Sequence, residues 1–185
     1  MYGLINAALR ELIIARHGST AWDQIAVVAA PDIADFDKMA PYPDELSFRI
    51  LETAHRVTGI EVDAFVDQLG EFWVEYTDAQ GYGTLFDIAG DSLHDFLLSL
   101  NTLHARVGRS FSGLKPPSFR FDHVDKRDLR MHYLSERQGL CPMIFGLMRG
   151  LSLRFRTEVT VAEEACVRRG AEHCQFLITF PRKAF

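Results

Sequence analysis

Residues 132–138 read HYLSERQ, and polar side chains occupy alternate positions of this stretch. Successive side chains of a β-strand point to opposite faces, so Tyr133, Ser135 and Arg137 are predicted to project as one row. Leu129 and Met131 precede them on the same face, which therefore runs from apolar to polar. A phenol, a hydroxyl and a guanidinium are donors suited to carboxylates. An ordinary half-exposed strand face would show the same alternation, so the row alone is a weak signal.

The segments on either side of this row predict an α+β protein, with a helical first part followed by an antiparallel sheet. Ser19 and Thr20 offer one N-cap, Asp91 or Ser92 offers another, and Gly59 is expected to end a helix. Helices are predicted over 2–17, 20–30, 44–58, 61–77, 93–109 and 141–156, with a short one between the glycines of 81–90; strands are predicted over 118–124, 129–137, 156–167 and 174–180.

Composition limits the classes of function. The 185 residues, 48% of them hydrophobic, suit one globular domain. A net charge of −5 without a basic run argues against nucleic-acid binding, and no apolar stretch is long enough to span a membrane. Three cysteines, an odd number, favour a reducing compartment, so we expect a cytoplasmic protein.

A histidine interrupts the apolar stripe of the helix predicted over 93–109. The stripe consists of Leu93, Leu97, Leu100, His104 and Val107, and Phe111 continues it. A buried imidazole needs partners for its nitrogens, so His104 is either a core residue bonded to a carbonyl or a metal ligand. Haem would explain both the histidine and the polar row, because it needs an axial ligand and donors for its two propionates. His94, one step off the stripe, is expected to be solvated.

At this point the sequence resembles the haem nitric oxide/oxygen binding (H-NOX) family, which includes the haem domain of soluble guanylate cyclase. The resemblance rests on Tyr-x-Ser-x-Arg at 133–137 with a histidine about thirty residues upstream, and it covers essentially the whole chain. The other matching segments are MYGLINAAL at 1–9, GYGTL at 81–85, LHARV at 103–107, LKPPSF at 114–119 and GLCPMIFGL at 139–147.

The resemblance implies one H-NOX domain over 1–185 of the bacterial stand-alone type. A helical distal lobe would span about 1–65, and a proximal lobe with a four-stranded antiparallel sheet about 66–185. It implies haem b with His104 as the proximal ligand and with Tyr133, Ser135 and Arg137 holding the propionates. Pro117 and Ile5 would press on opposite faces of the haem.

The resemblance also bears on the gas. Oxygen-binding members carry a distal tyrosine after the Tyr-x-Ser-x-Arg motif, whereas this chain has no tyrosine beyond Tyr133 and aligns Met143 there. A methionine donates no hydrogen bond, and dioxygen needs a donor more than nitric oxide or carbon monoxide does. We therefore expect nitric oxide and carbon monoxide to bind at five-coordinate ferrous haem and oxygen to be excluded. Trp73, at a distal position, is either a donor or a packing residue, and an oxygen-binding H-NOX is the alternative.

Signalling would follow cleavage of the bond between iron and His104, which frees the helix over 93–109 to shift. Gly70 and Gly146 are expected to be hinge or close-packing positions. The expected output acts in trans on a separate histidine kinase or diguanylate cyclase. No distal histidine or arginine is expected beside the haem, so we predict no catalysis.

The three cysteines suggest a second metal. Some bacterial relatives hold zinc with three cysteines and a histidine; here Cys141, Cys166 and Cys174 align, and Glu163 takes the place of the histidine. Three reduced thiols or a redox-active pair are the alternatives. A zinc-stabilised interaction module without gas sensing is the corresponding alternative function.

Overall fold

The computed structural model describes residues 1–110 and 114–181, and it confirms the predicted α+β architecture. Phe111 lies outside the described residues. The helices are α1 Gly3–His17, α2 Ser19–Ala29, α3 Asp44–Thr58, α4 Val62–Thr77, α5 Gly83–Ala89, α6 Leu93–Val107 and α7 Met143–Phe155. The strands are β1 Ser118–His123, β2 Asp128–Leu134, β3 Thr160–Ala165 and β4 Cys174–Thr179. Within the described ranges, none of the helices combines the length and the apolar character needed to cross a bilayer.

Local signals account for several helix ends. Gly59 has φ 74° and ends α3 in the left-handed region, as predicted. Ser92 caps α6, because its hydroxyl accepts a hydrogen bond from the Asp95 backbone N–H at 3.1 Å. The prediction that Ser19 or Thr20 caps the second helix was wrong. Gly18 occupies the N-cap of α2 with φ 84°, so that one glycine both ends α1 and starts α2.

The four strands form one antiparallel sheet in the order β1-β2-β4-β3. Leu129, Met131 and Tyr133 of β2 point into the core together with Phe176 and Ile178 of β4. The strand ends at Leu134, so the prediction that Ser135 and Arg137 continue it was wrong. Pairing stops because the neighbouring β1 begins at Ser118, opposite Leu134, and β4 begins at Cys174, opposite Tyr133. Ser135 and Arg137 lie in the turn that follows.

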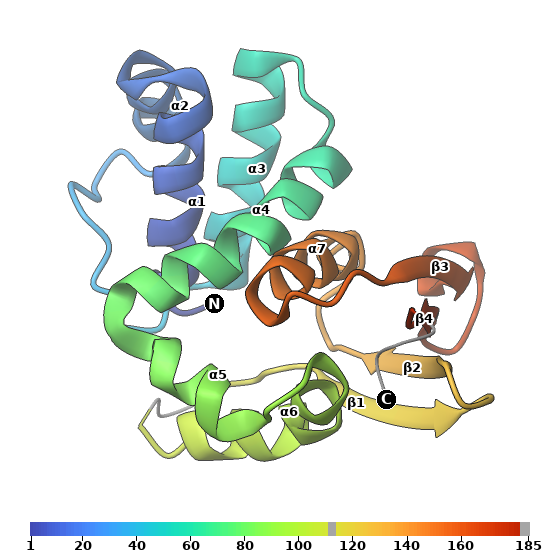
Figure 1. The fold of residues 1–185 in the computed structure, drawn as a ribbon. Helices are drawn as coiled ribbons and strands as arrows, with labels where there is room; N and C mark the ends of the chain where they lie inside the picture. Colours follow the sequence, from blue (N-terminus) through green and yellow to red (C-terminus); the bar gives the residue numbers. More distant parts are fainter. Residues whose placement is uncertain (111–113, 182–185) are drawn as a thin grey trace.

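Two hydrophobic cores meet along α4. In Figure 1, α1, α2 and α3 stand above α4, whereas α5, α6 and the sheet lie below or beside it. Phe65, Leu69 and Tyr76 of α4 belong to the core of the N-terminal helices. Val74 of the same helix belongs to the core formed with α6, α7 and the sheet. A lobe boundary near residues 65 and 66 therefore falls inside a helix that both lobes share, and it stays a prediction.

Glycines bring α4 and α7 into backbone contact. A Cβ atom added to Gly70 would stand 2.2 Å from the carbonyl oxygen of Met143, and one added to Gly146 would stand 1.8 Å from that of Asp67. Arg149 of α7 closes the contact at the surface with ion pairs to Asp67 at 2.6 Å and Glu71 at 2.9 Å. Of the two roles predicted for Gly70 and Gly146, the structure thus supports close packing.

Candidate cofactor site

His104 lies on α6 with one ring nitrogen already engaged. Its Nδ1 is 3.2 Å from the carbonyl oxygen of Pro117. A carbonyl only accepts, so Nδ1 carries the proton and Nε2 presents its lone pair. Burial lowers the pKa of His104; the bond to Pro117 opposes this effect but does not outweigh it. The imidazole is therefore neutral at pH 7, which is the form that binds a metal.

The surroundings of His104 differ from the stripe predicted by the sequence. Leu93 and Leu97 are buried, whereas Leu100, His104 and Val107 are only half-buried. His104 and Pro117 line a cavity of about 350 Å³ between α6 and the segment that precedes β1. The two roles considered for His104 are thus compatible, because a carbonyl bond at Nδ1 leaves Nε2 available as a ligand atom.

The predicted polar row is a cluster at the end of β2. Tyr133, Ser135 and Arg137 line one small hollow. Burial raises the pKa of Tyr133, so its phenol stays protonated. Ser135 accepts a hydrogen bond from the Arg137 backbone N–H at 3.1 Å, which fixes the turn. The structure therefore brings the three residues together although only Tyr133 is on the strand.

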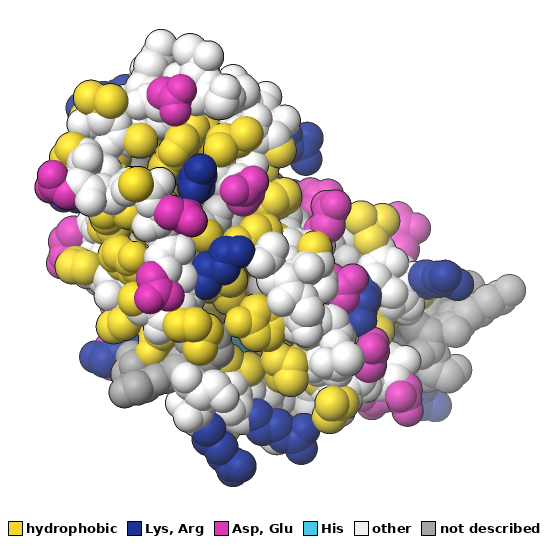
Figure 2. Space-filling model, turned by 90° about the vertical axis from the view of Figure 1, so that its left-hand side faces the viewer, with side chains coloured by type: hydrophobic (Ala, Val, Ile, Leu, Met, Phe, Trp, Pro, Cys, Tyr) yellow, Lys and Arg dark blue, Asp and Glu magenta, His cyan; other side chains and the backbone are white. Residues whose placement is uncertain are grey.

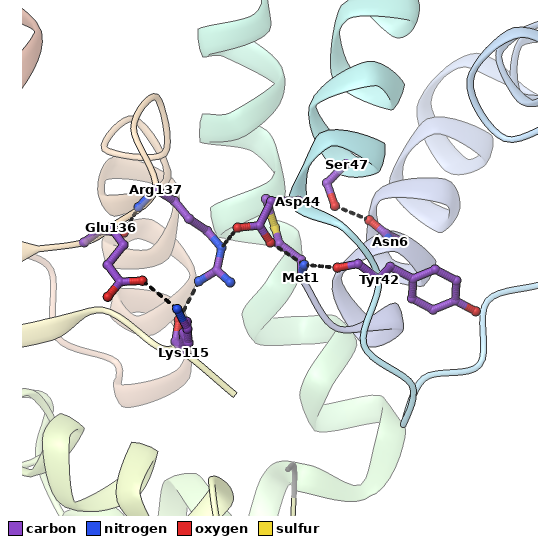
Figure 3. A network of polar contacts seen from close by, with 9 residues as sticks. Met1, Asn6, Tyr42, Asp44, Ser47, Lys115, Glu136 and Arg137 are labelled. Carbon is purple, nitrogen blue, oxygen red and sulfur yellow. Dashed lines mark hydrogen bonds and ion pairs between the residues drawn. The ribbon is translucent and has the colours of Figure 1, made fainter. Parts of the chain in front are cut away.

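Arg137 is held by Asp44 at the start of α3 and by the backbone at Lys115, as Figure 3 shows. Its Nε donates to Asp44 Oδ2 at 2.8 Å, and its Nη1 donates to the carbonyl oxygen of Lys115. Asp44 also accepts from the ammonium group of Met1. Within the part of the chain that the structure describes, Nη2 is the guanidinium nitrogen left for a further carboxylate.

Asp44 was missed by the sequence analysis. Burial raises the pKa of Asp44, but the hydrogen bonds from Met1 and Arg137 outweigh it and hold that pKa below its usual range. Asp44 begins α3, and an acidic residue in a first helical turn is common, so no local pattern singles it out.

Three further residues that the resemblance suggested belong to α1, α4 and α7, which stand above α6 in Figure 1. Ile5 on α1, Trp73 on α4 and Met143 on α7 are all half-buried, although Leu4 and Asn6 beside Ile5 are buried. Trp73 and Met143 pack against the core of the N-terminal helices. Figure 2 shows hydrophobic side chains running down the face where these helices stand above α5 and α6.

The three cysteines converge, whereas Glu163 does not join them. The sulfurs of Cys141 and Cys174 each lie 3.7 Å from that of Cys166, and all three lie within 4.8 Å of one another. Glu163 instead pairs with Arg169 at 2.8 Å. Among the described residues, no histidine or acidic side chain completes this cluster. Burial raises the pKa of Cys141 to about 12, so without a metal it is a thiol.

Two other histidines lie in defined surroundings, and the first departs from the expectation that it is solvated. His94 is not simply solvated, because its ring packs 5.4 Å from that of His123 and 5.7 Å from that of Phe180. His132 is buried on the other face of β2, where Nε2 lies 2.7 Å from Asp122 Oδ2 and Nδ1 lies 2.7 Å from Nε2 of His173. Neither contacts His104.

The residues present fit a haem. His104 offers a neutral Nε2, Arg137 keeps one guanidinium nitrogen for a carboxylate, and Tyr133 and Ser135 add hydroxyls. Among the described residues, the buried hydroxyl of Tyr76, on the same helix as Trp73, has no hydrogen-bond partner. Such an arrangement suits a cofactor whose metal takes one nitrogen ligand and whose side groups are acidic.

Comparisons with known proteins point the same way. Residues 2–163 match the sequence model of a family described as Haem-NO-binding. The chain is 28% identical over 162 residues to soluble guanylate cyclase gcy-31 and over 183 residues to gcy-35, both of Caenorhabditis elegans. These alignments cover 87% and 97% of this chain but only 23% and 26% of the two cyclases, so the chain spans about a quarter of their length.

Solved structures share the fold. An H-NOX protein from S. oneidensis in the Fe(II)NO ligation state superimposes with a TM-score of 0.89, at 20% identity, over 98% of this chain and 99% of that one. A mutant of an H-NOX protein from S. oneidensis in the Fe(II) ligation state gives a TM-score of 0.91 at 19% identity, with both chains covered completely.

Proposed function

This chain belongs to the Haem-NO-binding (H-NOX) family, and on that basis we propose that it is a haem-based sensor of nitric oxide and carbon monoxide. One observation carries the proposal. The bond from His104 Nδ1 to the Pro117 carbonyl leaves Nε2 neutral and available as an iron ligand. Haem b, when bound, supplies the iron to which a diatomic gas attaches. The cyclase activity of the longer relatives is not proposed for this segment.

The residues around the site have separate tasks. His104 holds the iron and so ties α6 to the cofactor. Tyr133, Ser135 and Arg137 hold the propionates, and Asp44 orients Arg137 through the 2.8 Å contact. By resemblance, Pro117 and Ile5 would also contact the haem. With haem bound, a loosened attachment of His104 would free α6, and the contact of Pro117 with His104 Nδ1 would link that change to β1.

The output is proposed to pass to a separate partner protein. By resemblance this partner is a histidine kinase or a diguanylate cyclase, and the domain itself acts as a sensor without catalysis. A protein-binding role suits an H-NOX domain because motion of α6 changes the surface that a partner meets.

On the α7 side, Met143 offers a bound gas no hydrogen bond, which favours nitric oxide and carbon monoxide over oxygen. Oxygen is excluded only if α4 also offers a bound gas no hydrogen-bond donor.

An absorption spectrum of the haem-loaded ferrous protein tests the proposal. Native protein and His104→Ala are recorded under argon and then with nitric oxide, and His94→Ala serves as the matched control because it removes another histidine of α6. We expect a spectrum typical of a histidine-ligated haem for the native protein and the control, and its loss in His104→Ala. Equal spectra for all three proteins would show that His104 is not the ligand.

The cysteine cluster supports zinc as a second metal. Zinc bound tetrahedrally at a Zn–S distance of about 2.3 Å places its sulfurs ~3.8 Å apart. The two 3.7 Å separations in this structure agree with that value. We propose that Cys141, Cys166 and Cys174 supply three ligands and that Glu163 is not the fourth, since it pairs with Arg169.

Metal analysis of purified protein tests this site. Native protein is expected to hold one zinc per chain, Cys166→Ser to lose it, and Glu163→Gln to retain it. If native protein refolded with added zinc holds none, the three cysteines are reduced thiols and not a zinc site.

A further inference from the structure

Two histidines meet on the outer face of the sheet, opposite the face that carries Tyr133. His132 of β2 is 5% exposed, and its Nδ1 lies 2.7 Å from Nε2 of His173, which directly precedes β4. Successive strand side chains point to opposite faces, and Tyr133 and Cys174 are buried in the core on the inner face. The histidine pair is therefore separate from the proposed haem site and from the cysteine cluster.

Hydrogen bonds determine which nitrogen of His132 carries the proton. Nε2 lies 2.7 Å from Oδ2 of Asp122, and this bond holds the pKa of Asp122 below its usual range. A carboxylate only accepts, so Nε2 carries the proton. Nη2 of Arg120 lies 3.2 Å from Nδ1, and a guanidinium only donates, so Nδ1 has a lone pair. His132 is thus a neutral imidazole whose lone pair faces His173.

Polar groups from neighbouring strands converge on this lone pair. In the register of the sheet, Arg120 of β1 and Gln175 of β4 both lie opposite His132. His173 Nε2 holds the proton between the two rings, and the side-chain amide of Gln175 lies 3.2 Å from the same Nε2. Arg120 and His173 therefore compete to donate to one lone pair. A metal ion in place of the shared proton would engage the lone pairs of both rings at once.

The separation of the two ring nitrogens is close to that of two ligands on one metal ion. Zinc–nitrogen bonds of about 2.0–2.1 Å place two tetrahedral nitrogens ~3.3 Å apart. From the observed 2.7 Å, the rings would need to separate by about 0.6 Å. His173 is half-buried and lies outside the strands, so it can make this adjustment. The proton of His173 then moves from Nε2 to Nδ1 of the same ring, and both imidazoles stay neutral.

The contact between Asp122 and His132 is of the kind that supports a ligating histidine. Such a histidine almost always donates its other ring N–H to a carboxylate, a carbonyl or water, which fixes its tautomer and raises its basicity. Arg130 and Glu164, which also lie on this face, form an ion pair at 2.5 Å and offset each other. Asp122 therefore supplies the negative charge beside the pair, whereas Arg120 is the cation that a metal ion must displace. Arg120 is exposed and can turn into solvent.

We propose that His132 Nδ1 and His173 Nε2 are ligands of a divalent transition-metal ion of the zinc, nickel or copper class. Imidazole suits these ions. After a half-turn of its amide, Gln175 offers the carbonyl oxygen as a third ligand, and water completes the coordination. The ion would join β2 to the residue that precedes β4, and so it would tie the two central strands of the sheet together where β4 begins.

Calorimetric titration with nickel tests the site in protein supplied beforehand with haem and zinc, so that His104 and the cysteines are occupied. His173→Ala removes one ligand, and His123→Ala is the matched control because it removes an exposed histidine at the end of β1. Loss of a carboxylate that supports a ligating histidine lowers metal affinity about 10- to 100-fold. We therefore expect Asp122→Asn and His173→Ala to bind nickel at least tenfold more weakly than native protein or His123→Ala.

Arg120→Gln distinguishes a metal site from a cluster that only stabilises the fold. It removes the cation that competes for His132 Nδ1, so nickel should bind this variant more tightly than it binds native protein. Urea unfolding gives a second readout. Nickel should raise the unfolding midpoint of native protein, because it binds the folded state, and should leave the midpoint of His173→Ala unchanged.

Three results would overturn the proposal. The first is native protein that binds no nickel, and the second is equal nickel affinity in native protein and His173→Ala. The third is binding that is lost in His123→Ala instead, which would place the ion beside His123, whose ring lies 5.4 Å from that of His94. Each of these results leaves the sensor proposal intact, because the histidine pair lies on the other face of the sheet from Tyr133.

Discussion

Replacing Gly146 by alanine is expected to destabilise the protein although alanine is the better helix former. The new Cβ atom would stand 1.8 Å from the Asp67 carbonyl oxygen and 2.7 Å from the Glu71 nitrogen. Real Cβ contacts stay above 3.0 Å, so α4 and α7 must separate by at least 1.2 Å, the difference between 3.0 and 1.8 Å. The obstacle is helix backbone, which cannot rotate aside as a side chain can.

The magnitude follows from two opposing effects. Overpacking a core costs about 1–3 kcal/mol, and a backbone clash belongs at the upper end of this range. The gain in helix propensity offsets about 1 kcal/mol of it. A net loss of about 2 kcal/mol corresponds to ~4–8 °C in Tm for a chain of this size. The change is measured by thermal unfolding of the haem-free protein.

Gly108→Ala is the matched control for this substitution. The nearest atom to a Cβ at Gly108 is the His104 carbonyl oxygen at 3.2 Å, so the added methyl group needs only a small adjustment. Its Tm is expected to stay close to that of native protein. A Gly146→Ala protein as stable as native protein would refute the close approach of α4 and α7.

Three further predictions follow from the site. Arg137→Gln should release haem to a scavenging protein at least tenfold faster, since a charged bond contributes about 1.5–3 kcal/mol, whereas Lys115→Gln should not. The pKa of Asp44 is lowered in the folded state, so ionised Asp44 stabilises the protein. This stabilisation is complete above the unfolded pKa of about 4 and is lost as the pH falls through the lower folded pKa. In urea unfolding from pH 7 to 3, Asp44→Asn should therefore lose less stability on acidification than native protein. Cys141, with its pKa raised to about 12, should resist thiol reagents at pH 8 in folded, metal-free protein and react once it unfolds; rapid reaction in the folded state would contradict its burial.

Local patterns in the sequence predicted much of the fold. The helical stripes, Gly59 and Ser92 act over a few residues, so their effects are visible without tertiary structure. The spacing between His104 and the Tyr-x-Ser-x-Arg motif likewise identified the residues that we propose hold the cofactor. The alternation in HYLSERQ misled in one respect, because where a strand ends depends on where its partners begin.

The remaining features depend on contacts between distant residues. Asp44 pairs with Arg137 although 93 positions separate them in the chain, and no local sequence pattern predicts this pair. Glu163 was expected with the cysteines, but it lies beside Arg169, six positions away, across the turn between β3 and β4. The unpaired hydroxyl of Tyr76 is a property of its surroundings rather than of its neighbours in sequence.

The position of α4 between two cores has a consequence for folding. Phe65 and Leu69 are buried with the N-terminal helices, whereas Val74 is buried with the sheet, so neither core closes until α4 has formed. The two lobes should therefore unfold in one cooperative transition rather than in sequence. Cutting the chain near residue 65 would give two fragments, each with an exposed apolar face. These fragments should recover the native fold only when both are present.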